Sequence, residues 1–352
     1  MVTKTVVTAL IVSCLVSTPA GPAAAQSLDE LYRLAKAEGR VNLYGGGPAA
    51  IYTGWAKVFE EKFPGIKVQV TGDFSNRLTG RIDAQRKAGT MEADLAILQT
   101  IQDFVRWKKE GALVQWKPEG FEKIPSAFKD DDGTYVGIGV NGLVYAYNPK
   151  LVDTGDVPRS AKDFLNPRFA GKIVSTYPHD DDITLYLYHT IVERHGWQFM
   201  DGLMKNTPAY VMGHLGVAQK IAAGEFALTF DSTVSSTMGA KRRGGSIELA
   251  IPDDDPVPIW AQTAAIFKGA PHPNAARLYL AWYLSKEQQQ RMHRVGSWSP
   301  RNDVEPPAGF KPIDQYRLAR GFREFITDGA KVAELRKKFE GYIGPVKGEA
   351  YR

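Results

Sequence analysis

The sequence predicts an α/β protein of two lobes. Strands and amphipathic helices alternate over roughly the first hundred residues, and the alternation resumes after residue 170. Two long extended stretches, near 137–147 and 256–264, separate and rejoin these sets. Strand–helix alternation favours a largely parallel sheet covered by helices. A chain of 352 residues is long enough for two such units, and two crossings between them imply a ligand cleft at the junction.

The predicted first lobe begins with a capped helix. Ser27 and Glu30 have the spacing of a capping box, and apolar residues then recur at helical intervals until Gly39. Short alternating or apolar runs bounded by glycine and proline predict the strands, and longer periodic runs predict the helices. The expected strands are 41–44, 66–70 and 94–98, and the expected helices are 49–63, 76–88 and 101–110.

The second set of elements follows the first extended crossing. We expect strands at 173–175, 209–212 and 226–230, and helices that end near residue 194 and span 198–205 and 215–223. The second crossing leads into a helix that ends near residue 284, and Ser285 with Gln288 forms another capping box. We therefore assign residues 26–138 and 257–300 to lobe 1, and 139–256 and 301–352 to lobe 2.

The N-terminus has the pattern of a secretory signal peptide. Lys4 precedes an apolar run over 6–16, and small residues lead to an expected cleavage site after Ala25. This run is too short for a membrane span, which needs about 20 residues. Residues 1–25 are therefore predicted to direct export to the periplasm. Lipid attachment at Cys14 is a less favoured alternative, and without Cys14 the mature chain has no cysteine for disulfides or thiol chemistry.

Composition and motifs argue against several other classes of protein. The chain is 43% hydrophobic and 24% charged, and its net charge of +5 comes from basic residues interspersed with acidic ones. No nucleic-acid-binding motif accompanies them, so no nucleic-acid partner is expected. The sequence also lacks a G-x-S-x-G elbow, an H-E-x-x-H motif and a P-loop, and the glycines at 45–47 lack the lysine that a P-loop requires. An enzyme is therefore not predicted.

Three stretches carry a resemblance to a known family. Residues 37–44 (AEGRVNLY), 164–173 (FLNPRFAGKI) and 268–277 (KGAPHPNAAR), with SKEQQQ at 285–290, resemble extracellular solute-binding proteins of ATP-binding cassette (ABC) importers. The branch is the ferric-ion, thiamine and phosphonate type. The resemblance implies a type II periplasmic binding protein fold that closes by hinge motion on a small solute. It also implies an ABC permease as partner, a monomer, and no cofactor.

Ferric-ion binding is an alternative that the resemblance itself weakens. Ferric members anchor iron with adjacent tyrosines after the strand predicted here at 226–230, where this chain reads DSTVSS. Glycine (Gly46 and Gly47) stands where many members have a histidine, and Gln99 lies where some have an acidic ligand. Neutral groups cannot replace the anionic oxygens that a hard ferric ion prefers. We therefore predict no resident metal.

The run His179-Asp180-Asp181-Asp182 has three possible roles. Aspartates at the start of a helix cap it and complement its dipole. The same aspartates can also contact a ligand, because in the family this helix start faces the cleft. A metal site is a third possibility, since Asp182, Tyr186 and His189 are spaced to share one helical face.

The predicted ligand contacts come from both lobes and from a crossing. An aspartate-lined cleft favours a small polar organic solute that is cationic or zwitterionic, and Trp260 on the second crossing offers an aromatic surface. Asp231 is also expected to cap the helix that follows its strand. A carboxylate or phosphonate solute is an alternative if Arg77 or Arg301 points into the cleft. The predicted contacts are Gly46, Gly47, Gln99, Asp181, Asp182, Asp231, Ser232 and Trp260.

Overall fold

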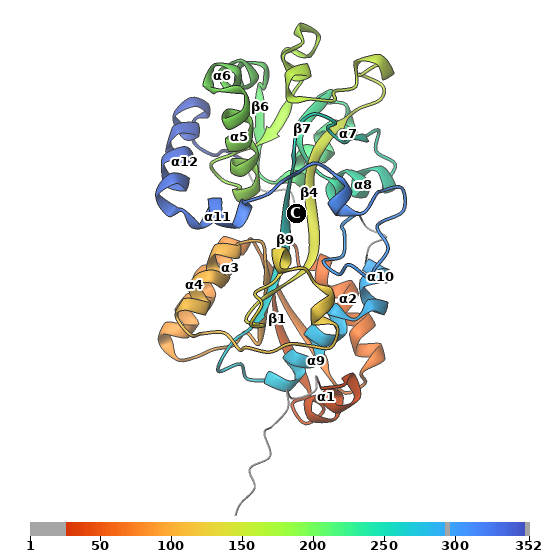
Figure 1. Cartoon of the computed structure of the whole chain (residues 1–352), viewed down its shortest axis with the longest axis vertical. Helices are drawn as coiled ribbons and strands as arrows, with labels where there is room; N and C mark the ends of the chain where they lie inside the picture. Colours follow the sequence, from red (N-terminus) through yellow and green to blue (C-terminus); the bar gives the residue numbers. More distant parts are fainter. Residues whose placement is uncertain (1–25, 293–295, 349–352) are drawn as a thin grey trace, which may run out of the picture.

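Two α/β lobes are stacked along the long axis of the molecule and joined by two extended strands (Figure 1). The computed structural model describes residues 26–292 and 296–348. The linking strands are β4 (Val136–Tyr147) and β9 (Val257–Ile266), which pair antiparallel across the junction. The predicted two-lobed α/β fold is confirmed. The predicted signal peptide (1–25), including Cys14, lies outside the described residues.

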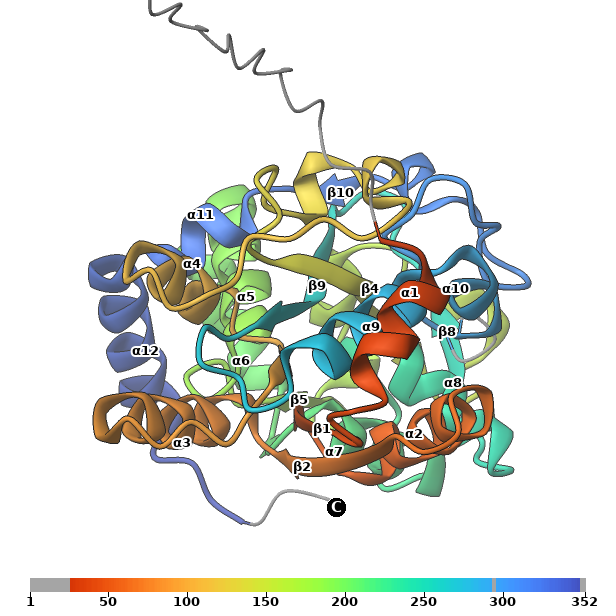
Figure 2. The ribbon, with the colours of Figure 1, turned by 90° about the horizontal axis from the view of Figure 1, so that it is seen from below.

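The first lobe is built on three parallel strands that continue into β9 and β4. The strand order is β2-β1-β3-β9-β4, with β1 (Arg40–Gly46), β2 (Lys67–Asp73) and β3 (Leu95–Leu98) parallel and β9 antiparallel to β3. Helices pack on both faces, as the alternating pattern predicts. Figure 2 shows α3 and α4 on one side and α2 and α10 on the other. The helices are α1 (Leu28–Ala35), α2 (Ala50–Lys62), α3 (Ser75–Ala88), α4 (Ile101–Lys109), α9 (Pro273–Leu284) and α10 (Lys286–Met292).

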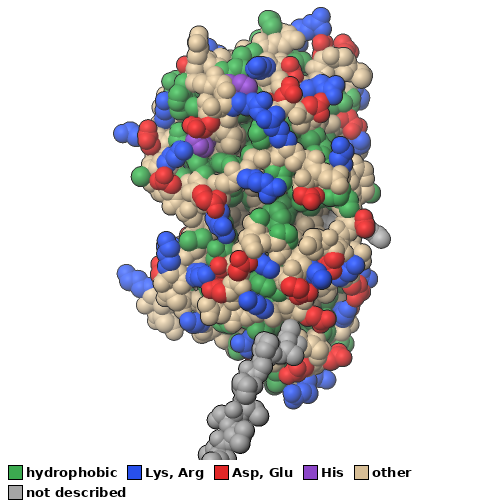
Figure 3. Space-filling model, in the orientation of Figure 1, with side chains coloured by type: hydrophobic (Ala, Val, Ile, Leu, Met, Phe, Trp, Pro, Cys, Tyr) green, Lys and Arg blue, Asp and Glu red, His purple; other side chains and the backbone are tan. Residues whose placement is uncertain are grey.

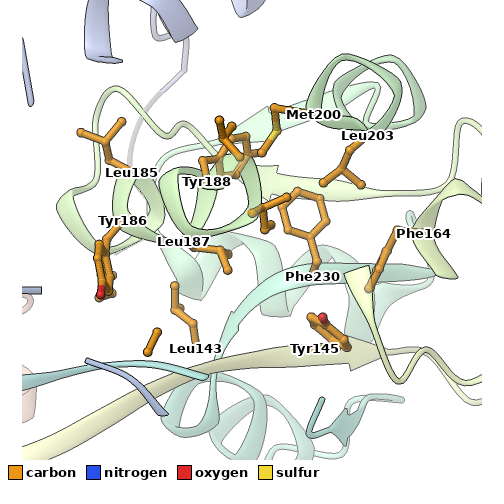
Figure 4. Close-up of a cluster of buried hydrophobic side chains, with 14 of the residues drawn as sticks. Leu143, Tyr145, Phe164, Leu185, Tyr186, Leu187, Tyr188, Met200, Leu203 and Phe230 are labelled. Atoms are coloured by element: carbon orange, nitrogen blue, oxygen red, sulfur yellow. The ribbon is translucent and has the colours of Figure 1, made fainter. Parts of the chain in front are cut away.

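The second lobe continues the same sheet beyond the crossings. The far end of β4 pairs with β7 (Leu228–Thr233) and β8 (Glu248–Ala250), and β5 (Val174–Thr176) pairs with β6 (Ala209–Val211) in a separate ribbon. Phe164, Tyr188 and Phe230 form its aromatic core, with ring centroids of Tyr188 and Phe230 5.5 Å apart (Figure 4). The helices are α5 (Asp182–His195), α6 (Trp197–Asn206), α7 (His214–Ala223) and α8 (Val234–Arg242).

The C-terminal segment packs beside the second lobe. It contains β10 (Leu318–Ala319), α11 (Phe322–Thr327) and α12 (Gly329–Ile343), none of which the sequence analysis predicted. Helices α11 and α12 both contact α5, and α11 also contacts α4 of the first lobe. The exact division of the chain between the lobes stays a prediction. Short 3-10 helices lie at 121–123, 126–128, 154–156, 161–165, 167–169 and 313–315.

One predicted helix start is wrong. Asp231 was expected to cap the helix after its strand, but β7 extends to Thr233, whose side chain accepts from Ser236 N and caps α8. The alternating pattern of 228–233 is buried throughout, so the strand continues three residues beyond the predicted end. Asp231 therefore lies inside a buried strand and its carboxylate has different partners.

The sheet topology indicates which edge of the first lobe can bind a ligand. Strands β1 and β3 are parallel, so their carboxyl ends meet at the edge that faces the second lobe, where ligands of open α/β sheets bind. Among residues 26–292 and 296–348, no helix is both long and apolar enough to cross a membrane.

Candidate functional site: the cleft between the lobes

Tight backbone packing shapes the first-lobe wall. A Cβ on Gly46 would lie 2.3 Å from Ser75 Oγ, so a larger residue at the carboxyl end of β1 would displace the Ser75 hydroxyl. Gln99 N donates to the same Ser75 hydroxyl at 3.1 Å, which joins the end of β3 to the start of α3. Gly47 has a φ of +104°, a conformation that favours glycine. The glycines thus have a packing role in this wall, and a ligand contact by Gly46, Gly47 or Gln99 stays a prediction.

Tyr52 and Gln262 complete this wall. The Tyr52 hydroxyl donates to Gly46 O at 2.9 Å and accepts from Gln262 Nε2 at 3.3 Å. Burial raises the pKa of Tyr52, so the phenol stays protonated. Gln262 lies on β9, so these two hydrogen bonds connect Gly46 to the linking strand β9 through Tyr52.

A buried ion pair forms the base of the second-lobe wall. Asp231 is fully buried, and its carboxylate accepts from His214 Nε2 at 3.0 Å, from Ser175 Oγ at 2.9 Å and from Thr176 N at 2.8 Å. Burial opposes the charged form of His214, but the negative charges of Asp231 and Asp181 outweigh it and raise the pKa of His214 to about 9. The same attraction lowers the pKa of Asp231 against its own burial. The pair is therefore ionised at neutral pH and carries no net charge.

Trp260 lies above this pair. Its ring is stacked with the His214 ring at a centroid distance of 6.5 Å. The indole Nε1 is buried and has no hydrogen-bond partner among the described residues. The hydroxyls of Thr176, at the carboxyl end of β5, and of Thr100, just before α4, are buried and unpartnered in the same way. Buried polar groups normally have partners, so these three are exceptions within the described part of the chain.

The aspartate run divides into separate roles. Asp181 caps α5, because its Oδ1 accepts from Ile183 N at 3.1 Å and from Thr184 N at 3.0 Å. Asp182 is 7% exposed and contacts Gln102 and Arg336. Burial and the charge of Asp181 raise the pKa of Asp180. The predicted capping role is thus confirmed for Asp181, whereas ligand contact by Asp181 or Asp182 stays a prediction.

The C-terminal segment covers the helix face that suggested a metal site. The Tyr186 hydroxyl donates to Arg320 O at 2.6 Å, and the His189 ring stacks on Phe325 with centroids 4.8 Å apart. Asp182, on the same face, pairs with Arg336. These three side chains therefore hold α11 and α12. Within the described part of the chain, no group of three or more His, Cys, Asp or Glu side chains is arranged to hold a metal.

The remaining predicted contacts have protein partners. Ser232 is fully buried and its hydroxyl lies 2.8 Å from Thr237 Oγ1 of α8. Arg301 is buried against Leu284 O and Asp303, so the structure does not bring it to the cleft residues. Arg77 is largely exposed, lies 3.5 Å from Asp73 Oδ1, and influences Asp180 electrostatically. Of the two arginines proposed for an anionic solute, only Arg77 interacts across the lobes.

A separate cavity of about 280 Å³ lies between α4 and the residues 319–324. Its wall includes Ala261 and Thr263, which alternate along β9 with Gln262. Ile259 and Trp260 of the same strand also line the cavity, so residues on both sides of β9 reach it. Trp260 is the only predicted contact among its lining residues.

Comparison with known proteins agrees with this geometry. The family of bacterial extracellular solute-binding proteins matches residues 54–312, which is most of the chain. The chain belongs to this family. It is therefore a solute-binding protein of the periplasmic, transport-associated type, and its family is not one of enzymes. Curated relatives include an uncharacterized protein of Haemophilus influenzae, 23% identical over 74% of this chain and 78% of that protein. A probable ABC transporter periplasmic-binding protein of Sinorhizobium fredii is 20% identical over 65% of both chains.

Solved structures share the fold. Iron-bound HitA from Pseudomonas aeruginosa has a TM-score of 0.73 at 20% identity and covers 85% of this chain and 99% of its own. AfuA from Actinobacillus pleuropneumoniae, solved with fructose-6-phosphate, has a TM-score of 0.71 at 18% identity and covers 86% of this chain and 98% of its own. At these identities the likeness establishes the type II binding-protein fold of the solute-binding protein.

Several residues of the site were not identified from the sequence. His214, Thr176 and Gln262 sit in ordinary helix and strand contexts, and no spacing sets them apart. The one available signal was for His214, which follows Gly213 directly at the start of a helix. Only the fold shows that this histidine reaches Asp231.

Proposed function

We propose that this solute-binding protein is a periplasmic receptor that closes on a small polar organic solute without net charge and delivers it to an ABC permease. The solute is a neutral polyhydroxy compound or a zwitterion. The observation that carries this proposal is the combination of paired charges with buried, unpartnered neutral polar groups on both lobes and on the crossing strand β9. The receptor is expected to act as a monomer, because each copy contains both lobes.

The pairing of the buried charges disfavours a simple cation or anion. Asp231 is neutralised by His214, and Asp182 is paired with Arg336. Burying a further charge against already paired groups costs free energy unless it brings its own partner. A zwitterion can place its cationic group toward Asp180 or Asp181 and still enter without net charge.

The unpartnered groups favour a solute with several oxygens. The buried hydroxyls of Thr100 and Thr176 can donate and accept, and the Trp260 indole can only donate. Thr100 lies in the first lobe, Thr176 in the second and Trp260 on the crossing strand. A solute bonded to all three contacts both lobes only when they are close together, so it stabilises the closed state.

A calorimetric binding screen of residues 26–352 tests the proposal. The panel holds neutral sugars and polyols, amino-acid zwitterions, simple amines, carboxylates, sugar phosphates and ferric salts. We expect saturable binding in the first two groups, and a rise in melting temperature that follows RT ln(1 + [L]/Kd). Binding confined to ferric ion or to sugar phosphates would overturn the proposed solute class.

Trp260 provides an independent readout. A solute that contacts the indole should change the intrinsic fluorescence of the wild-type chain, and most of that change should be lost in Trp260→Phe. An equal fluorescence change in both proteins would remove Trp260 from the site.

A further inference from the structure

Asp182 joins three elements that are distant in sequence. It is the first residue of α5, and its Oδ2 accepts from Gln102 Nε2 at 2.8 Å. Its Oδ1 accepts from Arg336 of α12. Gln102 belongs to α4 of the first lobe, whereas Asp182 and Arg336 belong to the second-lobe side of the junction. The carboxylate is therefore a contact between the lobes.

This contact depends on the distance between the lobes. A hydrogen bond of this type needs a donor–acceptor distance of about 2.7–3.2 Å. A hinge motion that carries α4 away from α5 beyond the reach of the Gln102 side chain breaks the Gln102–Asp182 bond. Helix α11 contacts both α4 and α5, so the C-terminal segment spans the same junction. Opening of the lobes must therefore disrupt both the Gln102–Asp182 bond and the contacts of α11 with α4 and α5.

The carboxylate of Asp182 has little exposed surface and few hydrogen-bonding positions left for a solute. Both carboxylate oxygens already accept from protein donors, and the residue is 7% exposed. Burial raises the pKa of Asp182, while Arg336 and Gln102 oppose this and favour the charged form. Charge-assisted hydrogen bonds are stronger than those between neutral groups.

We propose that Gln102, Asp182 and Arg336 form an interlobe latch that sets how readily the receptor closes, and that Asp182 acts as a positioning residue through this latch. Breaking the latch lowers the population of the closed state before any solute binds. Because apparent affinity scales with the population of the binding-competent state, affinity falls although no solute contact changes. We expect about a tenfold loss, which corresponds to about 1.4 kcal/mol at 25 °C.

The chain offers a matched control for this latch. Gln115 Nε2 donates to Asp132 Oδ2 at 2.9 Å, the same type of bond, but both residues lie in the first lobe. Gln102→Met and Gln115→Met each remove an amide donor and keep a side chain of similar length. Only the first change removes a bond between the lobes. Arg336→Met tests the third member of the latch independently.

The experiment measures the lobe separation in the protein without solute. The sequence after Cys14 contains no cysteine, so Lys87→Cys on α3 and Lys205→Cys on α6 provide unique attachment sites for a pair of spin labels. Pulsed electron–electron double resonance then gives the distribution of distances between the two spin labels. We expect Gln102→Met and Arg336→Met to shift it to longer distances, and Gln115→Met to match the wild type.

Two outcomes would overturn the latch. One is an unchanged distance distribution in Gln102→Met, and the other is an equal shift in Gln115→Met. The affinity effect rests on the proposed function, but the distance measurement does not, because it uses no solute. A wrong solute class would therefore leave the distance result intact, whereas a wrong latch would fail even with the right solute.

Discussion

Replacing Asp231 with asparagine should remove a pH dependence of stability that the His214–Asp231 pair creates. His214 has a pKa of about 9 in the fold, against an ordinary value of 6.5. At about 1.4 kcal/mol per pKa unit, this difference corresponds to about 3 kcal/mol of stability. The contribution is fully present below pH 6.5. It decreases as pH rises and is lost above about pH 9, because the folded state then gives up the extra proton that it held.

The assay is urea unfolding of residues 26–352 at several pH values from 6 to 10. Breaking a buried pair by removing one partner typically costs about 3–5 kcal/mol, so Asp231→Asn should be least stable relative to wild type near pH 6.5. The difference between the two proteins should narrow by about 3 kcal/mol by pH 10.

A matched control separates this effect from general titration. Asp156 pairs with Arg168 at 2.6 Å, so Asp156→Asn removes a carboxylate that has no histidine partner. Its stability should follow the wild-type pH profile. Parallel profiles for wild type and Asp231→Asn would refute the reasoning, because they would mean that His214 does not retain its proton in the folded state.

Other substitutions test the walls of the cleft. Thr176→Val keeps the shape of the side chain and removes an unpartnered hydroxyl. The free energy of unfolding should be unchanged or rise by up to about 1 kcal/mol, while solute affinity falls about fivefold. A loss of stability in urea unfolding would contradict this prediction. Gly46→Ala places a Cβ 2.3 Å from Ser75 Oγ and should lower the free energy of unfolding by about 1–3 kcal/mol, an effect that Ser75→Ala should partly rescue. Asp181→Ala removes the cap of α5 and should cost about 1 kcal/mol; if affinity measured by calorimetry falls as well, the carboxylate also contacts the solute.

The surface charge on the face shown in Figure 3 is mixed in sign. Lysine and arginine side chains are interspersed with aspartate and glutamate over the face of the molecule shown in Figure 3. This agrees with the scattered basic residues of the sequence, whose net charge of +5 reflects no dense cluster on that face.

The sequence by itself determined the local structure. Helical and alternating periodicity gave most elements to within a few residues, because each pattern reflects which side chains are buried on one face. Capping of α5 by Asp181 followed in the same way, since the cap bonds only to residues two and three positions ahead. The two extended crossings indicated two lobes, and the family resemblance added the type II binding-protein fold. None of these inferences required knowledge of distant contacts.

Only the tertiary structure decided which charges are free. His214 and Asp231 are 17 residues apart, and Asp182 is 80 residues from Gln102 and 154 from Arg336. Periodicity is silent about such pairs, because it reports burial of a side chain and not the identity of its partner. Asp231 is paired by His214 of α7, and Asp182 is paired by Arg336 of α12 and bonded by Gln102 of α4. The charge state of these aspartates therefore depends on contacts between elements distant in sequence, which form only when the chain is folded.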